Sequence, residues 1–74
     1  SSYEAIKLFI GLIGEGKLKI NQRLVEVISR SAELSLYYVI ATKSSFKLGE
    51  VAIMKSKAGR EEYLRLLKSF NEKL

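Results

Sequence analysis

The chain has 74 residues, of which 13 are basic, 8 are acidic and none is His, and its formal net charge at pH 7 is +5. A sequence of this length forms one domain, which we expect to span residues 1–74. Hydrophobic residues make up 47% of the chain and charged residues 28%, a balance that excludes an intrinsically disordered tail. Because Cys is absent, disulfides and thiolate chemistry are excluded as well.

Membrane insertion and secretion are not expected. The longest apolar run, residues 36–41, is far shorter than the roughly 20 residues that cross a bilayer. No basic segment leads into an apolar stretch near the N-terminus, so the sequence predicts a cytoplasmic protein without a signal peptide. Every acidic residue is Glu, and this Lys- and Glu-rich composition resembles that of hyperthermophile proteins.

The first predicted helix covers residues 1–14. Ser1 and Glu4 match the S-x-x-E capping box at its start, and Gly14 and the glycine that follows end it. Its polar strip is narrow, so we expect the helix to be mostly buried, and the short connection after it predicts an antiparallel neighbour. Its apolar residues are Ile6, Leu8, Phe9, Ile10, Leu12 and Ile13.

The second predicted helix, residues 21–42, is the longest, and we expect the rest of the chain to pack around it. Asn21 is a favoured N-cap residue. At about 100° per residue, its polar side chains form one narrow arc and apolar side chains fill most of the remaining circle, which indicates burial on at least two sides. The polar arc consists of Gln22, Arg23, Glu26, Ser29, Arg30 and Glu33.

The segment after this helix has two interpretations. The first is a short helix at residues 45–56, which gives an all-α fold: a compact bundle of three long helices and one short helix. The second is an α+β fold, winged-helix-like, with a β-hairpin at residues 34–55, because the first half of that range is rich in Tyr, Val, Ile and Thr. We favour the helical fold, since the apolar pattern of residues 21–42 fits a helix with few violations.

The last predicted helix covers residues 59–74. Gly59 fits as its cap, and Glu61 and Glu62 would then lie in the first turn, where the helix dipole favours carboxylates. Its apolar face, which contains Tyr63 and Phe70, is expected to pack either on the bundle or in a groove of a partner.

No catalytic arrangement of residues occurs, and we do not expect an enzyme. General acid–base catalysis most often uses His, which is absent, and the Glu residues have no metal-ligand spacing. We therefore expect neither a metal nor a cofactor. Ser44 and Ser45 lack an activating base and fit a hinge or a helix cap better than a nucleophile. The segment GLIGEG matches neither the P-loop nor the dinucleotide-binding pattern.

The positive charge gathers in two parts of the sequence, residues 17–23 and residues 43–60. Basic loops of this kind bind phosphates without reading bases, and no RNA- or DNA-specific motif accompanies them. The alternative is that these are ordinary solvated loop residues. The candidate phosphate-binding residues are Lys17, Lys19, Arg23, Lys43, Lys47, Lys55, Lys57 and Arg60.

Aromatic and apolar side chains also point to a protein interface. Tyr is favoured at interaction hot spots, and so many apolar faces in a chain of this length suggest a surface that another chain buries. Packing within the chain is the alternative for each of these residues. The candidate interface residues are Tyr37, Tyr38, Ile40, Tyr63, Leu67 and Phe70.

Together these features predict a small, basic, non-enzymatic accessory or adaptor subunit. We expect it to bind a larger protein within a complex that handles nucleic acid, with non-specific contacts to a DNA or RNA backbone. One alternative is a pure protein-interaction or homodimerisation module. A second alternative, a winged-helix DNA-binding protein, requires the hairpin.

Overall fold

The computed structural model describes residues 2–72, in which all regular secondary structure is helical. The all-α prediction is therefore confirmed. The β-hairpin at residues 34–55 is wrong, because residues 34, 35, 38 and 39 are buried together, a spacing that belongs to one face of a helix. The elements are α1 (Ser2–Gly14), α2 (Gln22–Ser29), α3 (Ala32–Thr42), the 3-10 helix η1 (Lys47–Gly49), α4 (Glu50–Ile53) and α5 (Lys57–Glu72).

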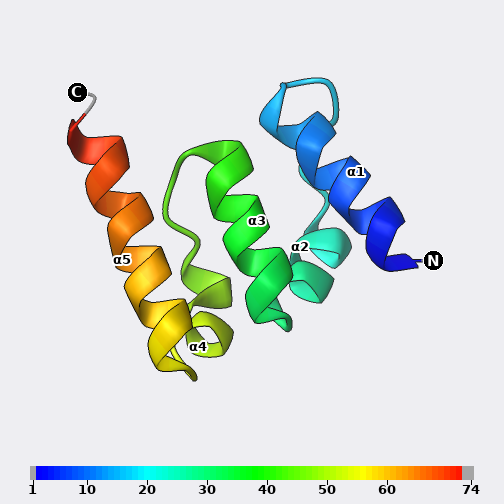
Figure 1. Ribbon diagram of the computed structural model, residues 1–74. Coiled ribbons are helices and arrows are strands. Elements are labelled where there is room, and N and C mark those ends of the chain that lie inside the picture. Colours follow the sequence, from blue (N-terminus) through cyan, green and yellow to red (C-terminus); the bar gives the residue numbers. More distant parts are fainter. Residues whose placement is uncertain (1, 73–74) are drawn as a thin grey trace.

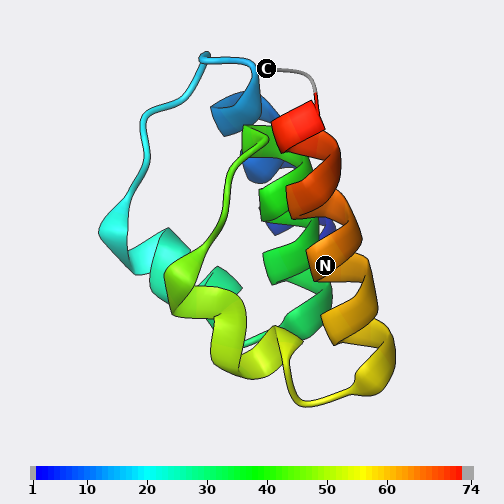
Figure 2. The same ribbon diagram turned by 90° about the vertical axis from the view of Figure 1, so that its left-hand side faces the viewer.

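The helices form two layers. Helices α1, α3 and α5 lie side by side with α3 in the middle, and their colours show that all three run in the same direction (Figure 1). The short elements α2, η1 and α4 form the second layer, together with the two connections that return the chain between the long helices (Figure 2). The molecule measures 28 × 28 × 19 Å, and its smallest dimension matches two helices of about 10 Å diameter.

The predicted antiparallel packing of the first two helices is wrong. Gly16 ends α1 in the left-handed conformation (φ 77°), as expected for a glycine at this position. Residues 17–21 then carry the chain back along α1, at about 3.3 Å per residue against 1.5 Å per residue in a helix. A few residues therefore span most of the length of α1, so the next long helix, α3, begins at the same end of the layer as α1. The predicted cap Ser1 lies outside the described residues.

The predicted continuous helix over residues 21–42 is also wrong, because the chain breaks at Arg30 and Ser31. Ser31 has extended backbone angles (φ −115°, ψ 126°), and its hydroxyl oxygen accepts a hydrogen bond from the backbone N–H of Leu34 at 3.1 Å. Ser31 is thus the N-cap of a new helix, α3. The Ser35 hydroxyl, which is fully buried, donates at 3.0 Å to the carbonyl oxygen of Ile28 at the end of α2, and the backbone N–H of Ser31 donates to the same oxygen at 3.1 Å.

The core lies between the layers. Ile10 of α1, Ile28 of α2, Val39 of α3 and Ile53 of α4 are all 0% exposed, so each of these helices contributes to one shared cluster. The ring of Phe46, in the second connection, packs at 4.6 Å between centroids on a Tyr ring of α3.

The Tyr63 hydroxyl joins α5 to the second layer. It accepts a hydrogen bond from the backbone N–H of Phe46 at 3.1 Å and donates one to the Glu50 carboxylate at 2.7 Å. Tyr63 is 1% exposed. One phenol group therefore satisfies a buried backbone donor and fixes the start of α4 against α5.

The last helix begins earlier than predicted. It starts at Lys57, and the Ser56 hydroxyl accepts a hydrogen bond from the Gly59 N–H at 2.9 Å, so Ser56 caps the helix rather than Gly59. Gly59 is buried inside α5, where a Cβ atom would collide with the carbonyl oxygen of Ile53. Glu61 and Glu62 consequently lie beyond the first turn, which contains no acidic residue.

We predict that Tyr63→Phe lowers the free energy of unfolding by about 1–3 kcal/mol, because it leaves the buried Phe46 N–H and the Glu50 carboxylate without their partner. Tyr37→Phe is the matched control. Tyr37 is 40% exposed, so its substitution should change stability by less than about 0.5 kcal/mol. Urea unfolding of both variants measures the difference, and equal stability of the two would contradict the role of the Tyr63 hydroxyl.

The burial of Tyr63 also predicts that the free energy of unfolding depends on pH in the alkaline range. Burial raises the pKa of Tyr63 above its ordinary value of 10. Above pH 10 the unfolded chain loses this proton before the folded chain does, so the free energy of unfolding falls as pH rises through the folded pKa. The free energy of unfolding should therefore fall less steeply with pH in Tyr63→Phe than in the unmodified chain. Parallel pH profiles of the two proteins would contradict this role of Tyr63.

Candidate functional site

The outer face of α1 exposes large apolar side chains. Ile10 and Ile13 are buried, whereas Leu8, Phe9 and Leu12 are 71%, 43% and 38% exposed. The expectation that this helix is mostly buried is therefore wrong. Helix α1 lies at the edge of its layer and packs on α3 along one side (Figure 1), so a helix that is apolar almost all round keeps one apolar face in solvent.

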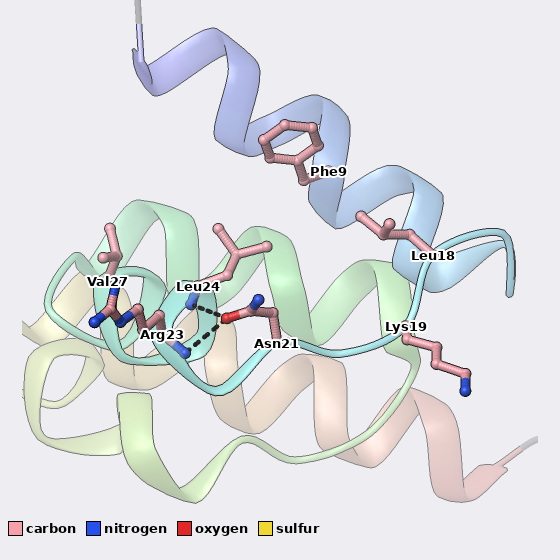
Figure 3. A pocket seen from close by; sticks show the side chains of 7 residues that line it. All are labelled: Phe9, Leu18, Lys19, Asn21, Arg23, Leu24 and Val27. Atoms are coloured by element: carbon pink, nitrogen blue, oxygen red, sulfur yellow. Dashed lines mark hydrogen bonds between the residues drawn. The ribbon is translucent and has the colours of Figure 1, made fainter.

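An apolar groove lies between α1 and α2, and we call it the α1–α2 groove. Its volume is about 480 Å³. Phe9 lies on its α1 wall, while Leu24 and Val27 point toward it from α2 and Leu18 from the connection (Figure 3). The residues that line it are Phe9, Leu18, Lys19, Asn21, Arg23, Leu24 and Val27.

Asn21 fixes the start of α2, the helix that forms one wall of the groove. Its side-chain oxygen accepts hydrogen bonds from the backbone N–H groups of Arg23 at 2.9 Å and Leu24 at 3.2 Å, drawn as dashed lines in Figure 3. The predicted N-cap is thus confirmed. Because α2 starts here, Leu24 and Val27 lie three residues apart on the same helix face and both border the groove.

The charged side chains at this groove are all basic. Lys19 lines the groove, and its side chain extends from the connection away from the hollow (Figure 3), while Arg23 belongs to the α2 side. Neither has a carboxylate within 4.0 Å among the described residues, and no acidic side chain lines the groove. Nearby, Lys17 is paired with Glu15 at 3.3 Å.

A second hollow of about 370 Å³ lies on the other side of α1, toward α3. One part of it is polar: Lys7 contacts Glu33 of α3 at 3.3 Å and lies 5.9 Å from the centre of the Tyr37 ring. The hydrogen bond with Glu33 raises the pKa of Lys7. The residues that line it are Lys7, Leu8, Phe9, Gly11, Leu12, Glu15 and Tyr37.

The predicted phosphate-binding residues fall into two regions. Lys17 and Lys19 lie in the first connection and Lys43 ends α3 at the start of the second, and these connections run along the same face of the molecule (Figure 2). Lys47 in η1 and Arg23 in α2 belong to the second layer as well.

The remaining three, Lys55, Lys57 and Arg60, lie in the turn between α4 and α5 or in the first turn of α5. The Arg60 guanidinium donates a hydrogen bond to the carbonyl oxygen of Met54 at 2.9 Å, which anchors it there. All three side chains are exposed.

The predicted interface residues separate into core and surface. Tyr38 and Tyr63 are 6% and 1% exposed and belong to the core, because their helices bury these faces against the second layer. Leu67 and Phe70 are half-buried and pack against the same core, so α5 uses its apolar face within the chain. The two candidates at the surface are Tyr37 and Ile40 of α3, which are 40% and 47% exposed.

Sequence reasoning missed the exposed residues of α1 and of the groove. Their signal was available, since residues 1–14 carry apolar side chains on nearly every side of a helix. A helix of that kind needs neighbours all around it, and a chain this short buries only a limited fraction of its surface. The missed residues are Leu8, Phe9, Leu12, Leu18 and Val27.

Within the part of the chain that the structure describes, no three His, Cys, Asp or Glu side chains come close enough to hold a metal ion. Two carboxylates are bonded within the chain: Glu50 to Tyr63, and Glu62 in a bidentate surface pair with Arg65 that lowers the pKa of Glu62. None of the helices in residues 2–72 has the length and apolar composition that crossing a bilayer requires.

We predict that Leu8→Gln changes the free energy of unfolding by less than about 0.5 kcal/mol, because the side chain is 71% exposed and Gln is an equally good helix former. Ile10→Gln, two residues away and 0% exposed, should destabilise the chain by several kcal/mol, on the order of 3, because it buries an amide without a partner. Urea unfolding tests both. A comparable loss in the two variants would show that Leu8 belongs to the core.

Comparisons with protein-family models, with curated proteins and with solved structures find no match for this chain. Its function is therefore inferred from its own surface, where the apolar face of α1 and the α1–α2 groove are the main features.

Proposed function

We propose that the chain is a non-enzymatic accessory subunit that binds a larger protein through the apolar surface around α1. This surface comprises Leu8, Phe9 and Leu12 of α1, Leu18 of the first connection and Val27 of α2, each at least 38% exposed. Contiguous apolar surface of this kind marks an interaction site when it occurs on a small protein. The exposure of α1 is the observation that carries the proposal.

The opposite edge of the layer supports this interpretation. Helix α5 also lies at an edge, but its exposed positions include the ion pair of Glu62 and Arg65 at 2.7 Å. A polar outer face suits an edge helix that meets water, and α1 lacks one. The two edges therefore differ in the way expected if α1 alone is covered by a partner.

A lipid surface fits α1 less well than a protein does. Helices that lie on membranes carry Lys and Arg along their polar face. Lys7 is the one basic residue of α1, and Glu33 already pairs with it at 3.3 Å.

Site-specific photo-crosslinking tests the proposal. A photoreactive phenylalanine analogue replaces Leu8 in one variant and Leu64 in a control; Leu64 is 59% exposed on α5. In cells that naturally make the chain, we expect one discrete protein adduct from position 8 and none from position 64, with the adduct lost when Phe9→Gln is added. No adduct from position 8, or the same adducts from both positions, would overturn the proposal.

Non-specific phosphate contact is a second candidate function, in the same subunit. It is supported by the exposed Lys55, Lys57 and Arg60 at the α4–α5 turn, which have no carboxylate within 4.0 Å among the described residues. Lys and Arg at a surface of this kind bind nucleic acid electrostatically, with an affinity that falls steeply with salt.

We predict that Lys55→Glu with Lys57→Glu weakens binding to labelled single- and double-stranded DNA and RNA, and lowers the slope of log affinity against log salt by about 2. Arg30→Glu with Lys68→Glu is the matched control, since it makes the same change in net charge at exposed positions elsewhere. Titrations at low and near-physiological salt measure both variants. An unchanged salt slope, or an equal loss in the control, would remove this second candidate.

A further inference from the structure

The α1–α2 groove has an apolar floor large enough for several side chains. Phe9, Leu24 and Val27 contribute to it from two helices, and its volume is about 480 Å³. Apolar pockets of this size take up the large side chains of a partner. The apolar floor alone does not select one kind of partner, but the charges beside it do.

The rim of the groove is positive. Lys19 and Arg23 are the charged residues that line it, and both lack an ion pair among the described residues. Glu26 is the acidic residue nearest in sequence on α2 and does not line the groove. A partner that fills the floor with apolar side chains buries apolar surface there. If it also places carboxylates over this rim, its affinity increases further, because complementary potentials favour association.

A second copy of this chain is disfavoured by the same charges. In a two-fold symmetric contact each surface meets itself, so the Lys19 and Arg23 side chains of both copies would gather at one small interface. Like charges brought together in this way oppose association.

The walls of the groove favour a helix as the occupant. An extended peptide that binds by strand addition needs the edge of a sheet for its main-chain hydrogen bonds, and residues 2–72 contain no strand. The non-helical part of the wall, residues 18–21, is too short to replace such an edge. A groove between two helices is instead suited to the apolar face of an amphipathic helix.

We propose that the α1–α2 groove binds an acidic amphipathic helix of the partner protein. The apolar face of that helix contacts Phe9, Leu24 and Val27, and its Asp or Glu side chains pair with Lys19 and Arg23. This inference rests on the proposed function, because it names the chemistry of the segment that the accessory subunit binds.

Selection from a displayed library of random helical peptides tests the inference. The immobilised full chain is the bait, and Phe9→Gln is the counter-selection. We expect the enriched peptides to place apolar residues at i, i+3 or i+4, and i+7, with Asp and Glu at the flanking positions. Failure to enrich any peptide, enrichment without acidic bias, or peptides that lack helical spacing would each overturn the inference.

Charge reversal provides the second readout on one enriched acidic peptide. Lys19→Glu with Arg23→Glu should weaken its binding by about tenfold, whereas Lys55→Glu with Lys57→Glu, which makes the same change in net charge outside the groove, should change it by less than about twofold. Equal losses in the two variants would mean that only the overall charge matters, which overturns the inference.

The two proposals fail in distinguishable ways. If position 8 crosslinks to a partner but the selected peptides show no acidic bias, the accessory-subunit function stands and the acidic helix is wrong. If light scattering instead finds a dimer that Phe9→Gln dissociates, a second copy occupies the surface and the acidic helix is wrong as well.

Discussion

The buried hydrogen bond from the Ser35 hydroxyl to the Ile28 carbonyl oxygen, 3.0 Å long, is the contact on which the arrangement of α2 and α3 depends. It gives the fully buried Ser35 hydroxyl a partner, and it adds a second hydrogen bond to a carbonyl oxygen that also accepts one from the Ser31 N–H at 3.1 Å. On the other side of the break, Ser31 stabilises the start of α3 as its N-cap. If residues 21–42 continued as one helix, α2 would extend the axis of α3 and the α1–α2 groove would lose its second wall.

The position of each long helix in its layer explains which apolar faces stay exposed. Helix α3 lies between two neighbours in the layer, whereas α1 and α5 each have a neighbour on one side (Figure 1). Helix α5 exposes the charged residues Glu62 and Arg65 to water, as suits a helix at the edge of a layer. Helix α1 exposes the apolar residues Leu8 and Phe9 instead. The two edges of the layer therefore differ in the composition of their exposed faces.

Local signals in the sequence predicted much of the fold but not its break or its order of packing. The all-α class and the Asn21 cap follow from periodicity and capping chemistry, which act over a few residues. The break at Ser31 was missed because the apolar pattern continues through it, whereas the contacts that stabilise it are the cap formed by Ser31 and the buried bond of Ser35. The exposure of α1 depends on which helix lies at the edge, and Tyr63 is buried because of Phe46 and Glu50, which lie far from it in sequence.

Methyl NMR of the isotope-labelled chain in complex with its crosslinked partner tests whether the apolar surface around α1 is the docking site. A soluble paramagnetic probe broadens the signals of exposed methyl groups. We expect the signals of Leu8, Leu12 and Val27 to become protected from the probe in the complex, while Val51 and Leu64, which are 75% and 59% exposed, remain accessible. Protection of Val51 or Leu64, with Leu8 still accessible, would contradict the claim that the apolar surface around α1 is the docking site.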